Sequence, residues 1–172
     1  MRRKFFTPKD KYYTNDMARA AIVRFCMYQE RCYTEVKGKL ADMRIYGEQA
    51  EHLILELMEE DVFSDERFAR AFARGKFRLK EWGKIRITRE LKARKISDYC
   101  IKKGLQELDE YDYYGTLLSY IERKNEYLQE PNPWNRRRKL TDMAIRRGFE
   151  MDLIYSAIKE VLGEINSSGQ LR

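Results

Sequence analysis

The amino-acid sequence predicts an all-α protein, and three observations support this prediction. The chain has 172 residues, of which nine are glycine and three are proline, too few for a turn-rich β protein. One spacing of apolar residues, with intervals of 4, 5, 5, 3, 1 and 3, occurs three times along the chain. The copies are offset by 51 and 53 residues. We therefore expect a tandem array of three three-helix repeats that forms an elongated, curved molecule.

Each copy of the spacing predicts two amphipathic helices that meet at a tight turn. The predicted helix breaks are Gly47, the pair Ser97 and Asp98, and Gly148. Generic helical periodicity explains the spacing within one helix, but it does not explain the same phase across the turn in all three copies. Gly104 alone fills a slot without being apolar. The slots are Val36, Leu40, Ile45, Ala50, Leu53, Ile54 and Leu57, then Ile87, Leu91, Ile96, Ile101, Gly104, Leu105 and Leu108, then Leu140, Ala144, Phe149, Ile154, Ala157, Ile158 and Val161.

A third helix precedes each of these pairs. We expect Asn15 or Asp16 to cap the first of them, Ser64 to open the second and Asp112 to open the third. A Pro-Asn-Pro segment at 131–133 must interrupt the helical pattern of the third repeat. The predicted organisation is a basic, flexible N-terminus (1–14), three repeats (15–62, 63–110 and 111–162) and a polar tail (163–172).

Charge is distributed unevenly among the predicted repeats. The chain carries a net charge of +7, to which residues 1–14 contribute +4. The first repeat carries −4, the second +6 and the third +1, whereas the tail is neutral. The second repeat is therefore the part that is suited to an anionic partner.

The basic residues of the second repeat predict a stripe along one helix. Arg67, Arg70, Arg74 and Arg78 are spaced by 3, 4 and 4 residues, which places them on one helical face. Such a stripe is able to bind a polyanion by releasing counterions, although a solvated charged face is the alternative. The candidate binding residues are Arg67, Arg70, Arg74, Arg78, Lys80, Lys84, Arg86, Arg89, Arg136, Arg137 and Arg138. The residues expected in the core of this repeat are Phe68, Phe72, Ile87, Leu91, Ile96, Ile101 and Leu105.

No pattern of catalytic residues is found in the sequence. There is no phosphate-binding GxxxxGK[ST] loop, no dinucleotide-binding GxGxxG and no CxxC pair. We expect no catalytic residue, no metal, no cofactor and no enzymatic activity. The sole histidine, His52, flanks an apolar helical stripe, and we expect Trp82 to anchor a turn. Three scattered cysteines, no secretory signal and no apolar run of about 18 residues predict a cytoplasmic protein that does not enter the membrane.

The stretch 63–108 resembles the central repeat of the RecX family of recombination regulators. In its first half the matching residues are Phe63, Asp65, Glu66, Arg67, Phe68 and Ala69, and in its second half they are Gly83, Arg86, Ile87, Glu90 and Leu91. The first repeat resembles the family's E-[LV]-x-x-K-L at Glu35, Val36, Lys39 and Leu40, and the third its R-R-G-F turn at Arg146, Arg147, Gly148 and Phe149. Together the matches cover residues 15–162. Two departures are Lys95, where the family usually has glycine at the central turn, and the insertion at 131–133.

This resemblance implies a partner as well as a fold. Proteins of the family bind the RecA recombinase, chiefly as its filament on DNA. They restrain filament growth, ATP hydrolysis, strand exchange and co-protease activity, and they are not enzymes. We accordingly expect a monomer that binds the RecA filament and contacts single- or double-stranded DNA. A DNA- or RNA-binding helical module without a recombinase partner is the alternative hypothesis.

Overall fold

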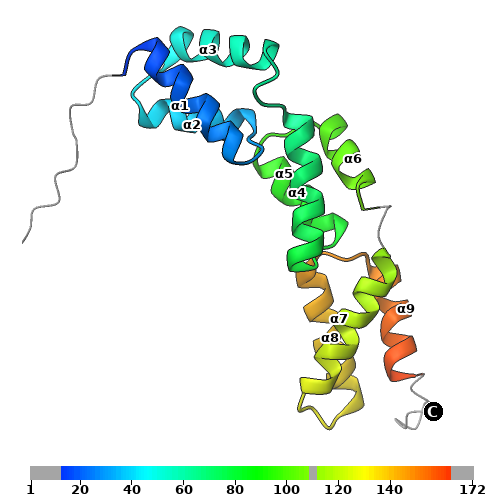
Figure 1. The fold of residues 1–172 in the computed structure, drawn as a ribbon. Coiled ribbons are helices and arrows are strands. Elements are labelled where there is room, and N and C mark those ends of the chain that lie inside the picture. Colours follow the sequence, from blue (N-terminus) through cyan, green and yellow to red (C-terminus); the bar gives the residue numbers. More distant parts are fainter. Residues whose placement is uncertain (1–12, 109–111, 164–172) are drawn as a thin grey trace, which may run out of the picture. The chain divides into compact units, whose positions relative to one another are not determined.

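The structure is a computed structural model that describes residues 13–108 and 112–163, so most of the predicted N-terminus (1–14) and tail (163–172) lies outside the described residues. Within these residues all regular secondary structure is α-helical, which confirms the predicted fold class (Figure 1). In the part of the chain that the structure describes, no helix is long and apolar enough to cross a membrane. The helices are α1 (Asn15–Tyr28), α2 (Tyr33–Asp42), α3 (Gly47–Glu59), α4 (Asp65–Lys80), α5 (Lys84–Ala93), α6 (Asp98–Gln106), α7 (Tyr113–Tyr127), α8 (Pro133–Arg147) and α9 (Met151–Leu162).

The chain forms two compact units, Met1–Phe68 (unit 1) and Ala69–Arg172 (unit 2). Within unit 1, α1 packs on α2 and α2 packs on α3. Their shared core includes Ile22, Leu40 and Ile54, all of which are fully buried. Within unit 2, α5 packs on α6, and α7, α8 and α9 pack on one another.

The repeated apolar slots form the cores of both units. Every slot residue is buried except Leu105 and Val161, which are half-buried. A fully buried leucine or isoleucine side chain contributes about 1.5–3 kcal/mol of hydrophobic stabilisation, so these slots supply much of the favourable term that opposes conformational entropy. Gly104, the exception in the sequence pattern, is also buried. A Cβ at this position would lie 2.8 Å from the Ala69 carbonyl oxygen, so glycine is required for α6 to pack this closely on α4.

The turn between the second and third helix is the same in all three repeats. Arg44, Lys95 and Gly148 have φ angles of 62°, 60° and 85°, and they are separated by the repeat offsets of 51 and 53 residues. The amide of the next residue then donates to a carbonyl five residues back, as in a Schellman motif. The three bonds are Ile45 N to Leu40 O (3.0 Å), Ile96 N to Leu91 O (3.2 Å) and Phe149 N to Ala144 O (3.4 Å). Lys95 therefore adopts the left-handed conformation that glycine would adopt more easily.

Side-chain caps define several helix starts. The Oγ of Ser97 and the Oδ1 of Asp112 accept amide hydrogen bonds at the starts of α6 and α7, and Asp112 is the residue that the sequence predicts at the start of its helix. The cap of α1 is Thr14, whereas the sequence suggested Asn15 or Asp16. Asn132 caps α8 by accepting hydrogen bonds from two amides, and a proline follows at the first helical position. The insertion at 131–133 thus ends one helical pattern and starts the next.

In unit 2, the start of α5 contacts the end of α8 through the backbone. The amide of Gly83 donates to the Arg147 carbonyl at 2.9 Å, and the amide of Ile85 donates to the Gly148 carbonyl at 3.0 Å. The unpaired amides at one helix start are thereby satisfied by the unpaired carbonyls at another helix end. This contact requires both glycines. A Cβ on Gly83 would lie 2.2 Å from the Gly148 carbonyl oxygen, and one on Gly148 would lie 2.4 Å from the Arg86 Cβ.

We expect the substitution Gly83→Ala to destabilise the protein by about 3 kcal/mol, because its methyl group must push two backbones apart. Gly75→Ala is the matched control, since a Cβ at that position in α4 meets nothing within 4 Å. It should stabilise the protein by up to about 1 kcal/mol through helix propensity. Urea unfolding followed by circular dichroism measures both effects. Equal stability of the two variants would contradict the close backbone contact.

Candidate functional site

The first arginine of the predicted basic stripe, Arg67, lies in unit 1 and is held by carboxylates. Its Nε is 3.1 Å from the Glu30 carboxylate, and its NH1 forms an ion pair with Asp61. A further hydrogen bond reaches the Asp61 carbonyl at 3.0 Å. Arg67 therefore ties the start of α4 to the segment after α3, and most of its donors are used within the protein.

The next two arginines of the stripe share one carboxylate in unit 2. Arg70 NH1 lies 2.6 Å from Glu107 Oε1, and Arg74 NH1 lies 2.8 Å from Glu107 Oε2. The Glu107 side chain is only 13% exposed. Its hydrogen bonds with Arg70 and then with Arg74 lower its pKa, because they favour the ionised carboxylate. These ion pairs hold the end of α6 against α4.

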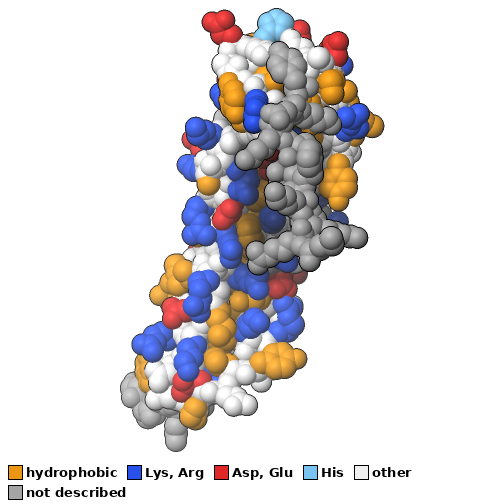
Figure 2. Space-filling view, turned by 90° about the vertical axis from the view of Figure 1, so that its left-hand side faces the viewer, with side chains coloured by type: hydrophobic (Ala, Val, Ile, Leu, Met, Phe, Trp, Pro, Cys, Tyr) orange, Lys and Arg blue, Asp and Glu red, His pale blue; other side chains and the backbone are white. Residues whose placement is uncertain are grey.

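Other predicted cations of this region are exposed. Arg78, Lys80 and Arg89 form no ion pair among the residues that the structure describes. Lys and Arg side chains (blue) are spread over the face that Figure 2 shows, with Asp and Glu side chains (red) scattered between them. Because no carboxylate among the described residues neutralises their charge, these three residues are the strongest candidates for contacts with an anionic partner.

Arg86 is fixed by an aromatic ring and a helix end. Its guanidinium lies 4.0 Å from the centre of the Trp82 ring, and its NH1 donates to the Arg146 carbonyl at 3.0 Å. Trp82 also contacts Phe72 edge-on, with 6.3 Å between the ring centres, and Lys76 lies 5.3 Å from its ring. Trp82 therefore packs at the turn before α5, as the sequence predicts. The contacts of the Trp82 ring with Arg86 and Lys76 orient both cations and occupy the faces of the ring.

The backbone of Lys84 takes part in a hydrogen-bond network that connects α5 with α7. The amide of Lys84 donates to the Tyr113 hydroxyl at 2.8 Å, and that hydroxyl donates to the Glu150 carboxylate at 2.7 Å. The Tyr113 ring stacks on Phe77 with 5.5 Å between ring centres. Burial is the main cause that raises the pKa of Tyr113 far above its ordinary value, so the hydroxyl stays protonated. This network positions the starts of α5 and α7 relative to each other.

The three consecutive arginines of α8 have different environments. Arg136 donates four hydrogen bonds to Asn125, Leu128 and Glu130, which fixes the connection between α7 and α8. Arg137 donates to the Gly163 carbonyl at 2.7 Å, at the end of α9. Arg138 is exposed. Of the three, Arg138 therefore has the most donors to offer a partner.

The residues expected in the core of the second repeat lie inside or at the edge of unit 2, apart from Phe68, which is buried at the end of unit 1. Phe72 and Leu105 are half-buried. The ring of Phe72 lies at the surface beside Lys76 and Arg94, at 5.2 and 4.9 Å. The buried members are Phe68, Ile87, Leu91, Ile96 and Ile101.

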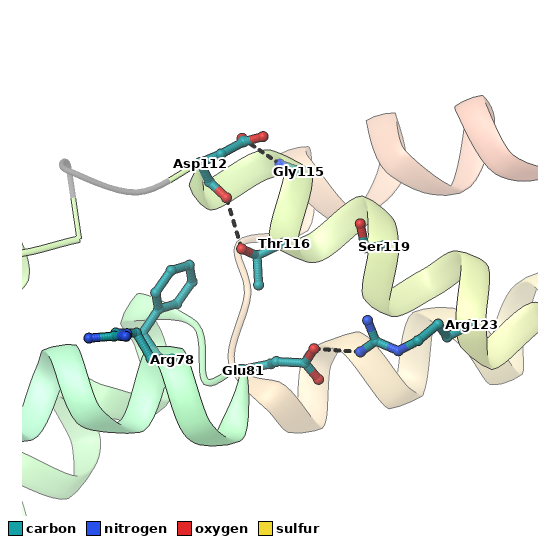
Figure 3. Close-up of a pocket in the computed structure, with 8 residues that line it drawn as sticks. Arg78, Glu81, Asp112, Gly115, Thr116, Ser119 and Arg123 are labelled. Atoms are coloured by element: carbon teal, nitrogen blue, oxygen red, sulfur yellow. Dashed lines mark hydrogen bonds and ion pairs between the residues drawn. The ribbon is translucent and has the colours of Figure 1, made fainter.

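A cavity of about 510 Å³ lies between the end of α4 and the start of α7. Figure 3 shows Glu81 and Arg123 facing each other across it as an ion pair, with Arg78 nearby. At the start of α7, Thr116 donates to the Asp112 carbonyl at 2.8 Å. In this cavity Glu81 and Arg123 are thus paired with each other, and the Thr116 hydroxyl is used at the start of α7.

No group of three or more His, Cys, Asp or Glu side chains suited to a metal ion occurs in the described part of the chain. The His52 side chain is 78% exposed and lies 3.3 Å from Glu56 on its own helix. Burial raises the pKa of the Cys26 and Cys32 thiols, which lowers their fraction of reactive thiolate.

Several charged residues around the predicted basic stripe were not identified from the sequence. Lys76 contacts two aromatic rings, Glu107 neutralises two arginines of the stripe, and Lys92 and Lys102 line a groove between α5 and α6. A comparison of equivalent positions in the three copies would have singled out Lys102, because the first copy has an acid there. No local pattern indicates that Glu107 reaches back to α4.

We expect Glu107→Gln to destabilise the protein by about 1–2 kcal/mol at neutral pH, through the loss of charge-assisted hydrogen bonds to Arg70 and Arg74. A lowered pKa means that the ionised carboxylate stabilises the fold above pH 4.5, its ordinary value, and that this is lost as the pH falls through the folded-state pKa. The stability of the variant should therefore fall less than that of the wild type in this acid range.

Thermal unfolding across this pH range measures the effect, with Glu122→Gln as control, because Glu122 is an exposed carboxylate on α7. If both variants showed the same pH dependence as the wild type, Glu107 would not hold α6 on α4.

Comparison with known proteins identifies the fold and the family. The model of the second three-helix domain of RecX matches residues 64–105, and the model of the third three-helix domain matches residues 110–158. The regulatory protein RecX of Bacillus cytotoxicus is 24% identical over 160 residues, and that of Bacillus thuringiensis is 22% identical. In both cases the match covers 92% of this chain but only 59% of the relative, so the chain spans about three fifths of their length.

Two solved structures have the same fold. RecX from Lactobacillus salivarius superposes with a TM-score of 0.74 at 22% identity, covering 86% of this chain and 96% of that chain. A second crystal structure of regulatory protein RecX superposes with a TM-score of 0.72 at 18% identity, covering 85% and 71%. The two domain models together match more than half of the chain. With its tandem three-helix repeats and these matches, the chain belongs to the RecX family.

Proposed function

We propose that this chain binds the RecA recombinase, chiefly as its filament on DNA, and restrains its ATP hydrolysis, strand exchange and co-protease activity. The observation that carries the proposal is that a member of the RecX family concentrates a net charge of +6 in residues 63–110. Its relatives are named regulatory proteins, which supports a regulatory rather than a catalytic role.

The proposed contacts are the exposed cations of unit 2. A recombinase filament on DNA presents phosphates and acidic protein groups, and exposed Lys and Arg side chains are attracted to both. Arg78, Lys80, Arg89 and Arg138 are exposed and therefore available for this role. Arg67, Arg70, Arg74 and Arg136 chiefly hold helices together. We also propose that the protein acts as a monomer in the cytoplasm and has no enzymatic activity of its own.

Titration of this protein into RecA that hydrolyses ATP on single-stranded DNA tests the proposal. We expect equimolar or lower amounts to reduce the rate of hydrolysis, because a bound regulator limits filament growth. An unchanged rate over this range would contradict regulation of RecA. Binding to DNA alone, falling steeply with salt and unaffected by RecA, would instead favour a general nucleic-acid-binding module.

The substitution Arg89→Glu should weaken filament binding about tenfold at low salt, because an attraction becomes a repulsion. Arg24→Glu is the matched control: Arg24 is also an exposed helical arginine, but it lies on α1 in the repeat of net charge −4. It should leave binding within about twofold of wild type. Fluorescence anisotropy with labelled single-stranded DNA coated by RecA measures both. Equal losses in the two variants would mean that the contact does not lie on unit 2.

A further inference from the structure

A groove of about 350 Å³ lies between α5 and α6 in unit 2. Lys84, Lys92 and Lys102 line it, and the side chains of Ile101 and Leu105 supply its apolar part. Lys92 and Lys102 are exposed, whereas Lys84 and Leu105 are half-buried. Lysines beside an apolar surface are the chemistry that recognises an apolar side chain flanked by carboxylates.

At the equivalent positions of the first repeat, a carboxylate is paired with the protein's own side chains. Positions 33, 37 and 51 precede 84, 88 and 102 by the repeat offset of 51 residues. The Glu51 carboxylate accepts a hydrogen bond from the Tyr33 hydroxyl at 2.7 Å and one from Lys37 Nζ at 2.5 Å. These contacts lower the pKa of Glu51, with the Lys37 hydrogen bond as the largest cause. The first repeat thus carries a paired carboxylate where the second repeat has Lys102.

In the second repeat, a positive charge replaces the negative charge of Glu51. Lys102 stands where the first repeat has Glu51, Lys84 replaces Tyr33, and Thr88 replaces Lys37. The acid that lines the groove is Asp98, which is 3.2 Å from Lys92, and both side chains are largely exposed. An exposed ion pair of this kind is worth only about 0–1 kcal/mol, so it competes weakly with an incoming carboxylate.

The third repeat differs again at the same positions. Arg137, equivalent to Lys84, donates to the Gly163 carbonyl at the end of α9, and Tyr155 stands at the position of Lys102. Only the second repeat therefore combines three lysines with the apolar slot residues of this groove.

We propose that the α5–α6 groove binds an acidic segment of a partner protein, whose carboxylates contact Lys84, Lys92 and Lys102 while an apolar side chain lies on Leu105 and Ile101. The apolar surface favours a polypeptide over a nucleic-acid backbone, because a backbone phosphate gains nothing from apolar side chains, whereas an apolar side chain of a peptide is removed from water there. This inference goes beyond the proposed function, since it concerns a protein contact that requires neither DNA nor RecA.

The test uses the full chain and a fluorescein-labelled synthetic helical peptide in which glutamates flank a stripe of leucines. We expect saturable binding in fluorescence anisotropy, about tenfold weaker for the same peptide with glutamines in place of glutamates. Lys102→Glu should also weaken binding about tenfold. Lys103→Glu is the control, because it makes the same charge change on α6 at a side chain that does not line the groove. It should keep binding within about twofold.

A double variant, Thr88→Lys with Lys102→Glu, recreates the ion pair of the first repeat and should abolish peptide binding. Its helix content and melting temperature should equal or exceed those of the wild type, which separates closure of the groove from unfolding. The proposal is overturned by absent wild-type binding, by equal losses for Lys102→Glu and Lys103→Glu, or by equal binding of the glutamine peptide. It is also overturned if labelled oligothymidine binds the groove more tightly than the acidic peptide and is lost with Lys102→Glu.

Discussion

The turn between the second and third helix is the constraint on which the rest of each repeat depends. A left-handed residue at Arg44, Lys95 or Gly148 ends one helix, and the next residue is a buried apolar side chain. A left-handed conformation costs a non-glycine residue about 1–2 kcal/mol. Burial of the following side chain offsets this cost, since a buried isoleucine contributes about 1.5–3 kcal/mol. Because one residue sets the direction of the chain and the next anchors it in the core, the phase of the third helix is fixed relative to the second.

The same turn makes the joint inside unit 2. Gly148 ends α8 without a Cβ, so the start of α5 approaches closely enough for the amides of Gly83 and Ile85 to donate to backbone carbonyls at 2.9 and 3.0 Å. The positive end of one helix dipole thereby meets the negative end of another. Tyr113 completes the joint by accepting the Lys84 amide. A backbone joint of this kind has few rotatable groups, so it orients helices more rigidly than long ion-paired side chains do.

The sequence predicted the helices and their buried faces because apolar periodicity is a local signal, and identical phase across a turn shows that a unit is repeated. It could not reveal which cations are available, because that depends on partners distant in the chain. Arg70 and Arg74 look like free members of a stripe until Glu107, more than 30 residues away, is seen between them. Arg136 likewise looks like part of a basic cluster, whereas two of its hydrogen bonds reach Asn125 in the last turn of α7. The charge of a residue is written in the sequence, but its neutralisation depends on the fold.

Comparison of equivalent positions separates the requirements of folding from those of binding. Gly104 replaces an apolar slot residue because the backbone of Ala69 leaves no room for a Cβ, so folding dictates that choice. Folding does not dictate the residue at another equivalent position, which is Glu51 in the first repeat, Lys102 in the second and Tyr155 in the third. An acid, a base and an aromatic residue are all compatible with the same pair of helices there. A position that the fold leaves free is open to selection by a partner. The groove at Lys102 lies in the repeat of highest positive charge. The lysine at this position and the charge of its surroundings therefore both favour an anionic ligand.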